Sequence, residues 1–111
     1  MKKFLLTYHM PIEMLENRPE PTPEKQKEGW KVWQEWKDRM GDRLIDLGAP
    51  LHFPHRFDGK GSAEEVKSTL AGYSIIQAND MEEALELMKQ HPHIGWTDGP
   101  QLEIHPFGEM S

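Results

Sequence analysis

The sequence predicts a single domain of the α+β class, built from strand, helix, strand, strand, helix and strand in that order. Three observations support this prediction. Apolar side chains recur at intervals of three or four residues between Trp30 and Leu47, a spacing typical of one face of a long helix. A second stripe with this spacing follows Asp80. Short apolar or alternating runs around the two helices have the length of strands.

The first strand and the first helix are separated by a proline-rich loop. Residues 4–8 form a short apolar run that suits a strand, and residues 10–22 hold three prolines and form the loop. Thr22 is a good N-cap, and the proline after it suits the first helical position. The apolar stripe predicts that the helix runs to Leu47, where a glycine and then a proline end it.

The second and third strands are predicted on either side of a loop. Residues 51–57 alternate between apolar and polar side chains, which indicates a strand. Pro54 cannot donate to a ladder, so we expect this strand to lie at an edge or to carry a bulge. Residues 58–69 read as a loop with at most one helical turn, and residues 73–78 as the third strand.

The second helix begins at Asp80, which has the capping-box spacing to Glu83, and stops before Pro92. Residues 102–105 alternate again and form the last strand. Right-handed crossovers favour one arrangement for this order of elements, a four-stranded antiparallel sheet of ferredoxin-like topology with both helices on one face.

Adjacent aliphatic residues in the two central strands predict a dimer. Leu5 stands beside Leu6, and Ile75 beside Ile76, so aliphatic side chains point to both faces of the sheet. A sheet with one wet face would alternate instead. We therefore expect a homodimer in which a second protomer covers the face opposite the helices.

Composition narrows the class of protein. With 111 residues the chain is one domain, residues 1–111, and its 19 acidic and 13 basic residues give a net charge of −6. No basic stripe is present, so we expect neither nucleic acid nor an anionic membrane as partner. The absence of cysteine excludes disulfides and thiolate chemistry. The apolar run after Met1 is too short for a signal or a membrane span, which places the protein in the cytoplasm.

The chain resembles the YCII-related family and its relatives with an Asp-Gly-Pro-Phe motif. The likeness includes Gly-Tyr-Ser-Ile-Ile-Gln-Ala in the third strand, and the matching residues are 5–8, 47–48, 72–84, 91–92 and 103–107. It implies a dimeric α+β barrel, in which two ferredoxin-like sheets pack face to face. Some relatives carry a His and Asp pair near the first strand and first helix. Asp58-Gly59 falls where the Asp-Gly-Pro-Phe motif of these relatives would lie, with Lys60-Gly61 in place of its Pro-Phe half, so only Asp58 is carried over from the motif.

Two histidines are the candidate catalytic residues. In the predicted topology His9 ends the first strand and His55 lies late in the second, parallel strand, so both fall at one edge of the sheet. Imidazole titrates near neutral pH and can serve as a general base. The alternative is that both are structural, His9 capping its strand and His55 bonding to backbone. His52, His105 and Asp46 are expected nearer the opposite edge.

The candidate ligand-binding residues surround the same edge. They are Tyr8, Trp30, Trp33, Asp58 and His93. One or two of the tryptophan rings would line an apolar pocket beneath the proline-rich loop, and the alternative is that they pack in the core and the dimer. No three ligands converge on a metal, and no glycine-rich phosphate loop is present, so we expect no metal and no cofactor.

Two functions remain open on these residues. The first is a protein that binds a small organic ligand, with acid/base catalysis by a histidine, as in a lyase or isomerase, or a close non-catalytic relative. The second is a non-catalytic binding or interaction module. The sequence does not decide whether the chain is an enzyme.

Overall fold

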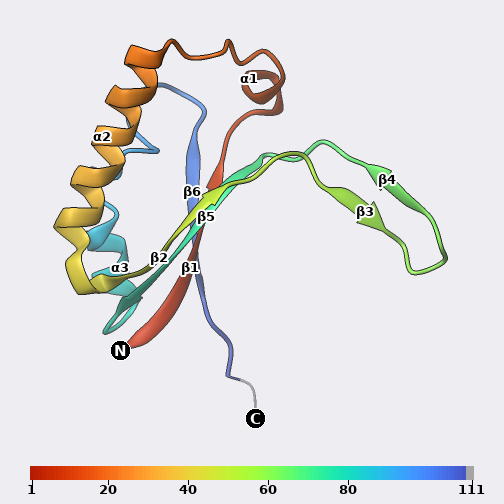
Figure 1. The fold of residues 1–111 in the computed structure, drawn as a ribbon. Helices are drawn as coiled ribbons and strands as arrows, with labels where there is room; N and C mark the ends of the chain where they lie inside the picture. The colour runs from red at the N-terminus through yellow and green to blue at the C-terminus, as the bar shows by residue number, and fades with distance from the viewer. Residues whose placement is uncertain (110–111) are drawn as a thin grey trace.

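The structure is a computed structural model that describes residues 1–109, and its architecture is α+β (Figure 1). These residues form six strands, three α-helices and one short 3-10 helix. The strands are β1 (Lys2–His9), β2 (Leu44–Pro50), β3 (His55–Phe57), β4 (Ala63–Glu65), β5 (Leu70–Ala78) and β6 (Gln101–Pro106). The helices are α1 (Ile12–Glu16), α2 (Pro23–Met40), the 3-10 helix η1 (Gly41–Arg43) and α3 (Met81–Leu87).

Four of the strands form one antiparallel sheet in the order β2-β5-β1-β6. The predicted four-stranded antiparallel sheet is therefore confirmed. At its centre Leu5 pairs with Ile75, and Leu6 pairs with Ser74. The remaining strands, β3 and β4, pair only with each other in a separate two-stranded ribbon.

Helices α2 and α3 pack on the same face of this sheet. Alternate residues of β1 and β5 point toward them, and one buried cluster joins strand and helix side chains. Its members are Phe4, Leu6, Tyr8, Ile76 and Ala78 from the strands and Trp36, Met40, Ala84 and Met88 from α2 and the end of α3. The two helices thus share a single core with the sheet.

Helix α2 begins where the sequence predicts but ends earlier. The Thr22 hydroxyl caps it by accepting from the Lys25 backbone N–H at 3.2 Å. Gly41, with φ of 55°, ends it in a conformation that favours glycine. The prediction that the helix runs to Leu47 is wrong, because residues 44–50 form strand β2.

Two bulges in β2 explain that error. The pairing of β2 with β5 shifts between Leu44 and Asp46 and again before Ala49. Leu44 and Leu47 consequently both pack against the core, three residues apart, although a regular strand would place inward residues two apart. A bulged strand here has the apolar spacing of a helix.

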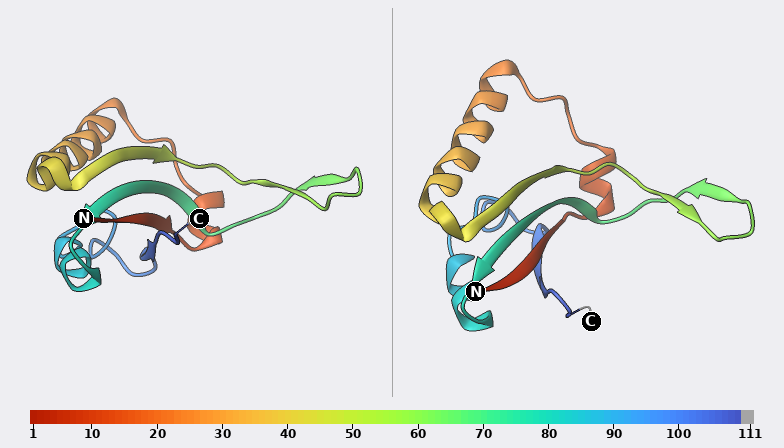
Figure 2. Two further views of the ribbon diagram at one scale, coloured as in Figure 1. Left: turned by 90° about the horizontal axis from the view of Figure 1, so that it is seen from below. Right: turned by 60° about the horizontal axis from the view of Figure 1, so that its bottom comes forward.

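The predicted strand at residues 51–57 is also wrong. Residues 51–69 form an extended segment that leaves the sheet after β2 and returns into β5, and we call it the arm. Its outer part is the β3–β4 ribbon, with Pro54 just before β3. The arm projects from the sheet, well away from α2 and α3 (Figures 1 and 2).

Helices α2 and α3 both pack on one face of the sheet, and we call the opposite face, as far as residues 1–109 describe it, the open face. Strand alternation places Leu5 and Ile75 there, both partly buried, while Leu6 and Ile76 lie fully buried on the helix face. The prediction that aliphatic side chains occupy both sides of the central strands is confirmed.

Candidate functional site

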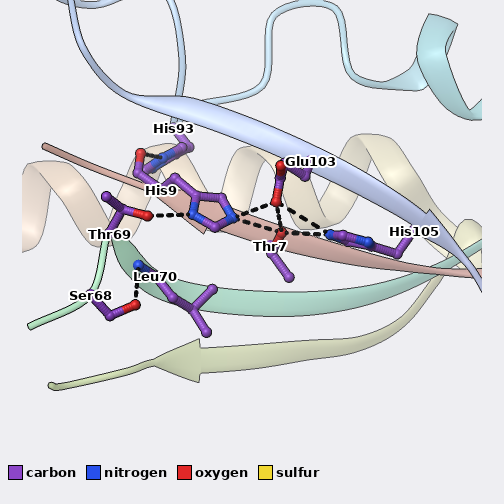
Figure 3. Close-up of polar contacts among 8 residues, drawn as sticks. All are labelled: Thr7, His9, Ser68, Thr69, Leu70, His93, Glu103 and His105. Atoms are coloured by element: carbon purple, nitrogen blue, oxygen red, sulfur yellow. Dashed lines mark hydrogen bonds and ion pairs between the residues drawn. The ribbon is translucent and has the colours of Figure 1, made fainter. Parts of the chain in front are cut away.

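A network of four polar side chains occupies the open face where β1 and β6 run side by side (Figure 3). Thr7 and His9 are two residues apart on β1, and Glu103 and His105 are two apart on β6, so all four point to one side. His9 Nε2 lies 2.9 Å from Glu103 Oε1. Thr7 Oγ1 lies 2.9 Å from His9 Nε2 and 3.1 Å from His105 Nε2.

The contacts of His9 assign its tautomer. A carboxylate only accepts hydrogen bonds, so the neutral ring carries its proton on Nε2 and donates it to Glu103. The Nδ1 atom then holds the lone pair and accepts from the Thr69 hydroxyl, whose oxygen is 3.0 Å away. Nδ1 is therefore the basic atom of this histidine, and it faces the end of the arm.

Glu103 is the point on which the donors of the network converge. The Thr7 hydroxyl donates to Oε1 over 3.5 Å, which leaves its oxygen free to accept from His105 Nε2. His105 Nε2 also lies 3.5 Å from Glu103 Oε1. The Glu103 side chain is 58% exposed, so its pair with His9 adds little stability in water. The orientation of the imidazole is the principal effect of the contact.

A second histidine cluster lies on the helix face, directly behind this network. The ring of Tyr8 packs against Trp33, His91 and His93 with centroids 5.1 to 5.4 Å apart. His91 also contacts Trp36 at 4.5 Å and is 1% exposed. The cluster closes the core at the end of β1.

One directed chain of hydrogen bonds links His91, Tyr8 and Ser74 in this cluster, while the buried Trp36 Nε1 has no hydrogen-bond partner among the residues that the structure describes. The His93 backbone N–H donates to His91 Nδ1 at 3.0 Å, so neutral His91 carries its proton on Nε2. That nitrogen lies 3.2 Å from the Tyr8 hydroxyl oxygen. Tyr8 donates to Ser74 Oγ at 2.7 Å, and Ser74 donates to the Leu47 carbonyl at 2.6 Å.

Burial perturbs the pKa values of three groups in the cluster. Desolvation, with smaller repulsion from His93 and Arg39, lowers the pKa of His91 to about 3, so its ring is neutral at physiological pH. Desolvation also lowers the pKa of His93. The pKa of the Tyr8 phenol is raised by burial, against a smaller opposing effect of its bond to Ser74. These groups hold their protons fixed, as a structural network requires.

The structure brings some of the sequence-predicted residues together and separates others. Tyr8, Trp33 and His93 form one aromatic cluster. His9 follows Tyr8 but points to the opposite face, where its partners are Thr7, Thr69 and Glu103. The His93 ring reaches the His9 backbone carbonyl with Nε2 at 3.0 Å.

The other three predicted residues lie outside both clusters. His55 and Asp58 are on the arm, away from His9, because residues 55–57 belong to β3 and not to the main sheet. The Asp58 carboxylate accepts from the Lys60 backbone N–H at 2.7 Å, which is turn chemistry. Trp30, near the start of α2, is 61% exposed.

A cavity of about 420 Å³ does lie beneath the proline-rich loop. Its walls are Met10, Glu13, Met14, Asn17, Arg18, Pro19 and Trp96. The aromatic wall is therefore Trp96, which donates from Nε1 to the His93 carbonyl at 2.8 Å, and not Trp30 or Trp33. Met10, one of these wall residues, is buried, whereas Trp96 is exposed.

Sequence reasoning missed the partners of His9. Period-two alternation places Thr7 with His9 and Glu103 with His105, but only the pairing of β1 with β6 shows that the two sets meet. His105, expected at the far edge, joins the same network because Thr7 and Glu103 lie between it and His9. Within residues 1–109, no three His, Asp or Glu side chains form a group suited to a metal ion.

No helix in the described part of the chain combines the length and the apolar character needed to cross a membrane. No protein-family model matches the chain, and no curated protein matches it either.

Proposed function

We propose that this chain is a small-molecule-binding protein of the dimeric α+β barrel type, whose site is the polar network on the open face. The contact between His9 Nε2 and Glu103 Oε1, 2.9 Å long, carries the proposal. A carboxylate that orients a histidine and fixes its tautomer makes the other ring nitrogen an effective base. The proposed reaction is proton transfer to or from a bound organic molecule, with His9 as the acid/base group.

The fold supports the barrel. The strand order β2-β5-β1-β6, with every neighbouring pair antiparallel, is the order expected of a ferredoxin-like sheet with two crossover helices. The open face presents Leu5 and Ile75 next to the polar network. A second copy packed on this face would bury the two aliphatic side chains and exclude water from His9 and Glu103. Membership of the YCII-related family, which the sequence resembles, remains part of this proposal.

Enclosure would change the energetics of the site. Contacts between charged or polar groups strengthen as the surrounding dielectric falls, so the hydrogen bond from His9 to Glu103, worth little on an open surface, becomes a firm restraint in a closed barrel. Only a small molecule could occupy such a space. The Thr69 hydroxyl occupies the lone pair of His9 in the free protein, and a ligand would replace that contact.

Deuterium exchange tests catalysis directly. Carbon acids next to a carbonyl are the natural targets of a histidine base, so the protein would be incubated in D2O with a panel of small carbonyl compounds. Proton NMR would follow loss of the signal at the adjacent carbon. We expect exchange with at least one compound, and a loss of about 100-fold in His9→Ala, within the usual range for removal of a general base.

His52→Ala is the matched control, because His52 is an exposed histidine on the arm and lies outside the network. Exchange by this variant should equal that of the unchanged protein. Binding without exchange would favour the alternative function, a non-catalytic binding module. Exchange that survives His9→Ala would show that the base lies elsewhere.

A further inference from the structure

The rest of the chain covers very little of the arm. All twelve residues from Pro54 to Glu65 are exposed, and Phe57 at the outer end of β3 is 66% exposed. Figure 2 shows the arm extending away from the sheet in both views. A large aromatic side chain in this position loses the benefit of burial unless another molecule covers it.

The arm is nevertheless built as a regular ribbon. The pairs His55–Glu65, Arg56–Glu64 and Phe57–Ala63 form its antiparallel register. The Val66 N–H donates to the Pro54 carbonyl at 2.9 Å and closes its inner end. An isolated two-stranded hairpin is only marginally stable in water, so this order favours a surface to pack against.

The ribbon has two chemically different faces. Directly paired residues share a face, so Phe57 and Ala63 lie together, and the same face carries His55 with Glu65. The other face carries Arg56 opposite Glu64. One side therefore offers an apolar contact at its outer end, and the other carries two exposed side chains of opposite charge, which suit water.

The exposed area of the whole chain is too large for a monomer. A monomeric protein of 12.9 kDa exposes about 6,300 Å². This chain exposes 8385 Å², an excess of roughly 2,000 Å² over that scaling. Its radius of gyration is 15.8 Å, against about 13 Å for a compact domain of this length.

That excess has the size of an obligate interface. Two chains together would have roughly 4,000 Å² to cover, within the 2,000 to 5,000 Å² range of permanent homodimers and beyond a transient contact. The open face alone presents a partly polar patch, and the arm supplies the rest of the extended surface. In a two-fold symmetric dimer each arm would pack against the same surface of the other protomer, so a second copy of the chain can cover both arms.

Charge also suits a second copy. The arm has three basic and three acidic side chains and thus no net charge, so the −6 of the chain lies outside it. These residues are Arg56, Lys60, Lys67, Asp58, Glu64 and Glu65. A neutral arm can approach an acidic copy of the chain without the repulsion that two acidic surfaces would meet.

We propose that the arm packs against a second copy of this chain through the Phe57–Ala63 face of its ribbon. The inference rests on the proposed dimer and adds to it a second contact, outside the open face. The arm ends at Thr69, which contacts His9, so a copy that covers the open face stands next to the base of the arm.

Shortening the arm tests this contact. The 2.9 Å bond from the Val66 N–H to the Pro54 carbonyl could also close a two-residue turn, so residues 55–65 can be replaced by Asn-Gly, the preferred sequence for such a turn. Sedimentation equilibrium would give the dimer dissociation constant, and far-UV circular dichroism would confirm folding. We expect the dimer to weaken by at least about tenfold, the equivalent of 1.4 kcal/mol.

Two point variants give a matched comparison that leaves the ribbon in place. Phe57→Ser should also weaken the dimer by about tenfold or more, since each copy loses an apolar contact. Arg56→Ser, on the other face of the ribbon, should change the dissociation constant by less than about twofold, the usual effect of a substitution at an exposed site. Amides of the arm should exchange slowly with D2O in the dimer.

The outcomes separate this inference from the proposed function. A dimer of unchanged affinity in the shortened variant and in Phe57→Ser would overturn the role of the arm and leave the barrel standing. An arm that binds a different protein would also leave the dimer affinity unchanged in both variants, and the proposal would then be wrong. A monomer at all concentrations in the unchanged protein would overturn both proposals.

Discussion

Replacing His91 with glutamine should remove the part of the acid destabilisation of this fold that comes from protonation of His91. His91 is buried, and its pKa in the folded protein is about 3, against 6.5 for an ordinary histidine. Above pH 6.5 the ring is neutral in both the folded and the unfolded chain, so His91 adds no pH dependence to the free energy of unfolding there. Below pH 6.5 only the unfolded chain binds the proton, so acid favours unfolding.

The size of the effect follows from the two pKa values. Stability should fall by about 1.4 kcal/mol for each pH unit below 6.5, until the folded ring is protonated near pH 3. At pH 4.5 the cost reaches about 2.7 kcal/mol, a large part of the total stability of a small domain. Glutamine cannot titrate, yet its amide can still donate to the Tyr8 hydroxyl.

Urea unfolding at pH 7.0, 5.5 and 4.5 would measure this directly. The variant should be less stable than the unchanged protein at pH 7.0, because it packs less well among Trp33 and Trp36. The difference in unfolding free energy should shrink by about 2.7 kcal/mol on going to pH 4.5. Carboxyl groups titrate alike in both proteins and cancel in this difference. Parallel stability profiles would refute the reasoning, since they would mean that His91 accepts a proton in the folded state.

Three further substitutions test other contacts. Gly48→Ala should destabilise the fold by more than about 3 kcal/mol in urea unfolding, because the added Cβ would stand 1.8 Å from the Tyr73 carbonyl oxygen and the residue has φ of 77°; near-native stability would mean that β2 can move. Tyr8→Phe should cost about 1 to 3 kcal/mol, because His91 loses its acceptor; a neutral result would imply another partner. Ile75→Lys should dissociate the proposed dimer in light scattering, since burying an unpaired charge costs several kcal/mol, roughly, and an intact dimer would place the interface elsewhere.

The sequence predicted the parts of the fold that local chemistry determines. The Thr22 cap and the Asp80 cap are both present, and the Asp80 carboxylate accepts from the Glu83 N–H at 2.8 Å. Leu5 and Leu6 point to opposite faces as their adjacency requires. These features depend on neighbouring residues alone, which is why they can be read without the tertiary structure.

The errors arose where tertiary pairing overrides local spacing. Leu44 and Leu47 have helical spacing only because bulges against β5 change the period of a strand. The alternation in residues 51–57 belongs to a ribbon that pairs within itself, and nothing in its pattern distinguishes that from a place in the main sheet. The sequence therefore predicts His55 at the edge that His9 occupies, whereas the carboxylate partner of His9, Glu103, comes from β6, almost a hundred residues along the chain.

The bulges of β2 also bear on how copies of this chain avoid uncontrolled assembly. Edge strands with regular, unpaired backbone invite strand addition from other molecules, the first step toward fibres. β2 is an edge strand, but its register shifts twice over seven residues and it ends at Pro50, which has no N–H to offer. The opposite edge strand, β6, also ends in a proline, Pro106. Self-association through the sheet edges is thereby discouraged, so any pairing through the open face can remain a closed, finite complex.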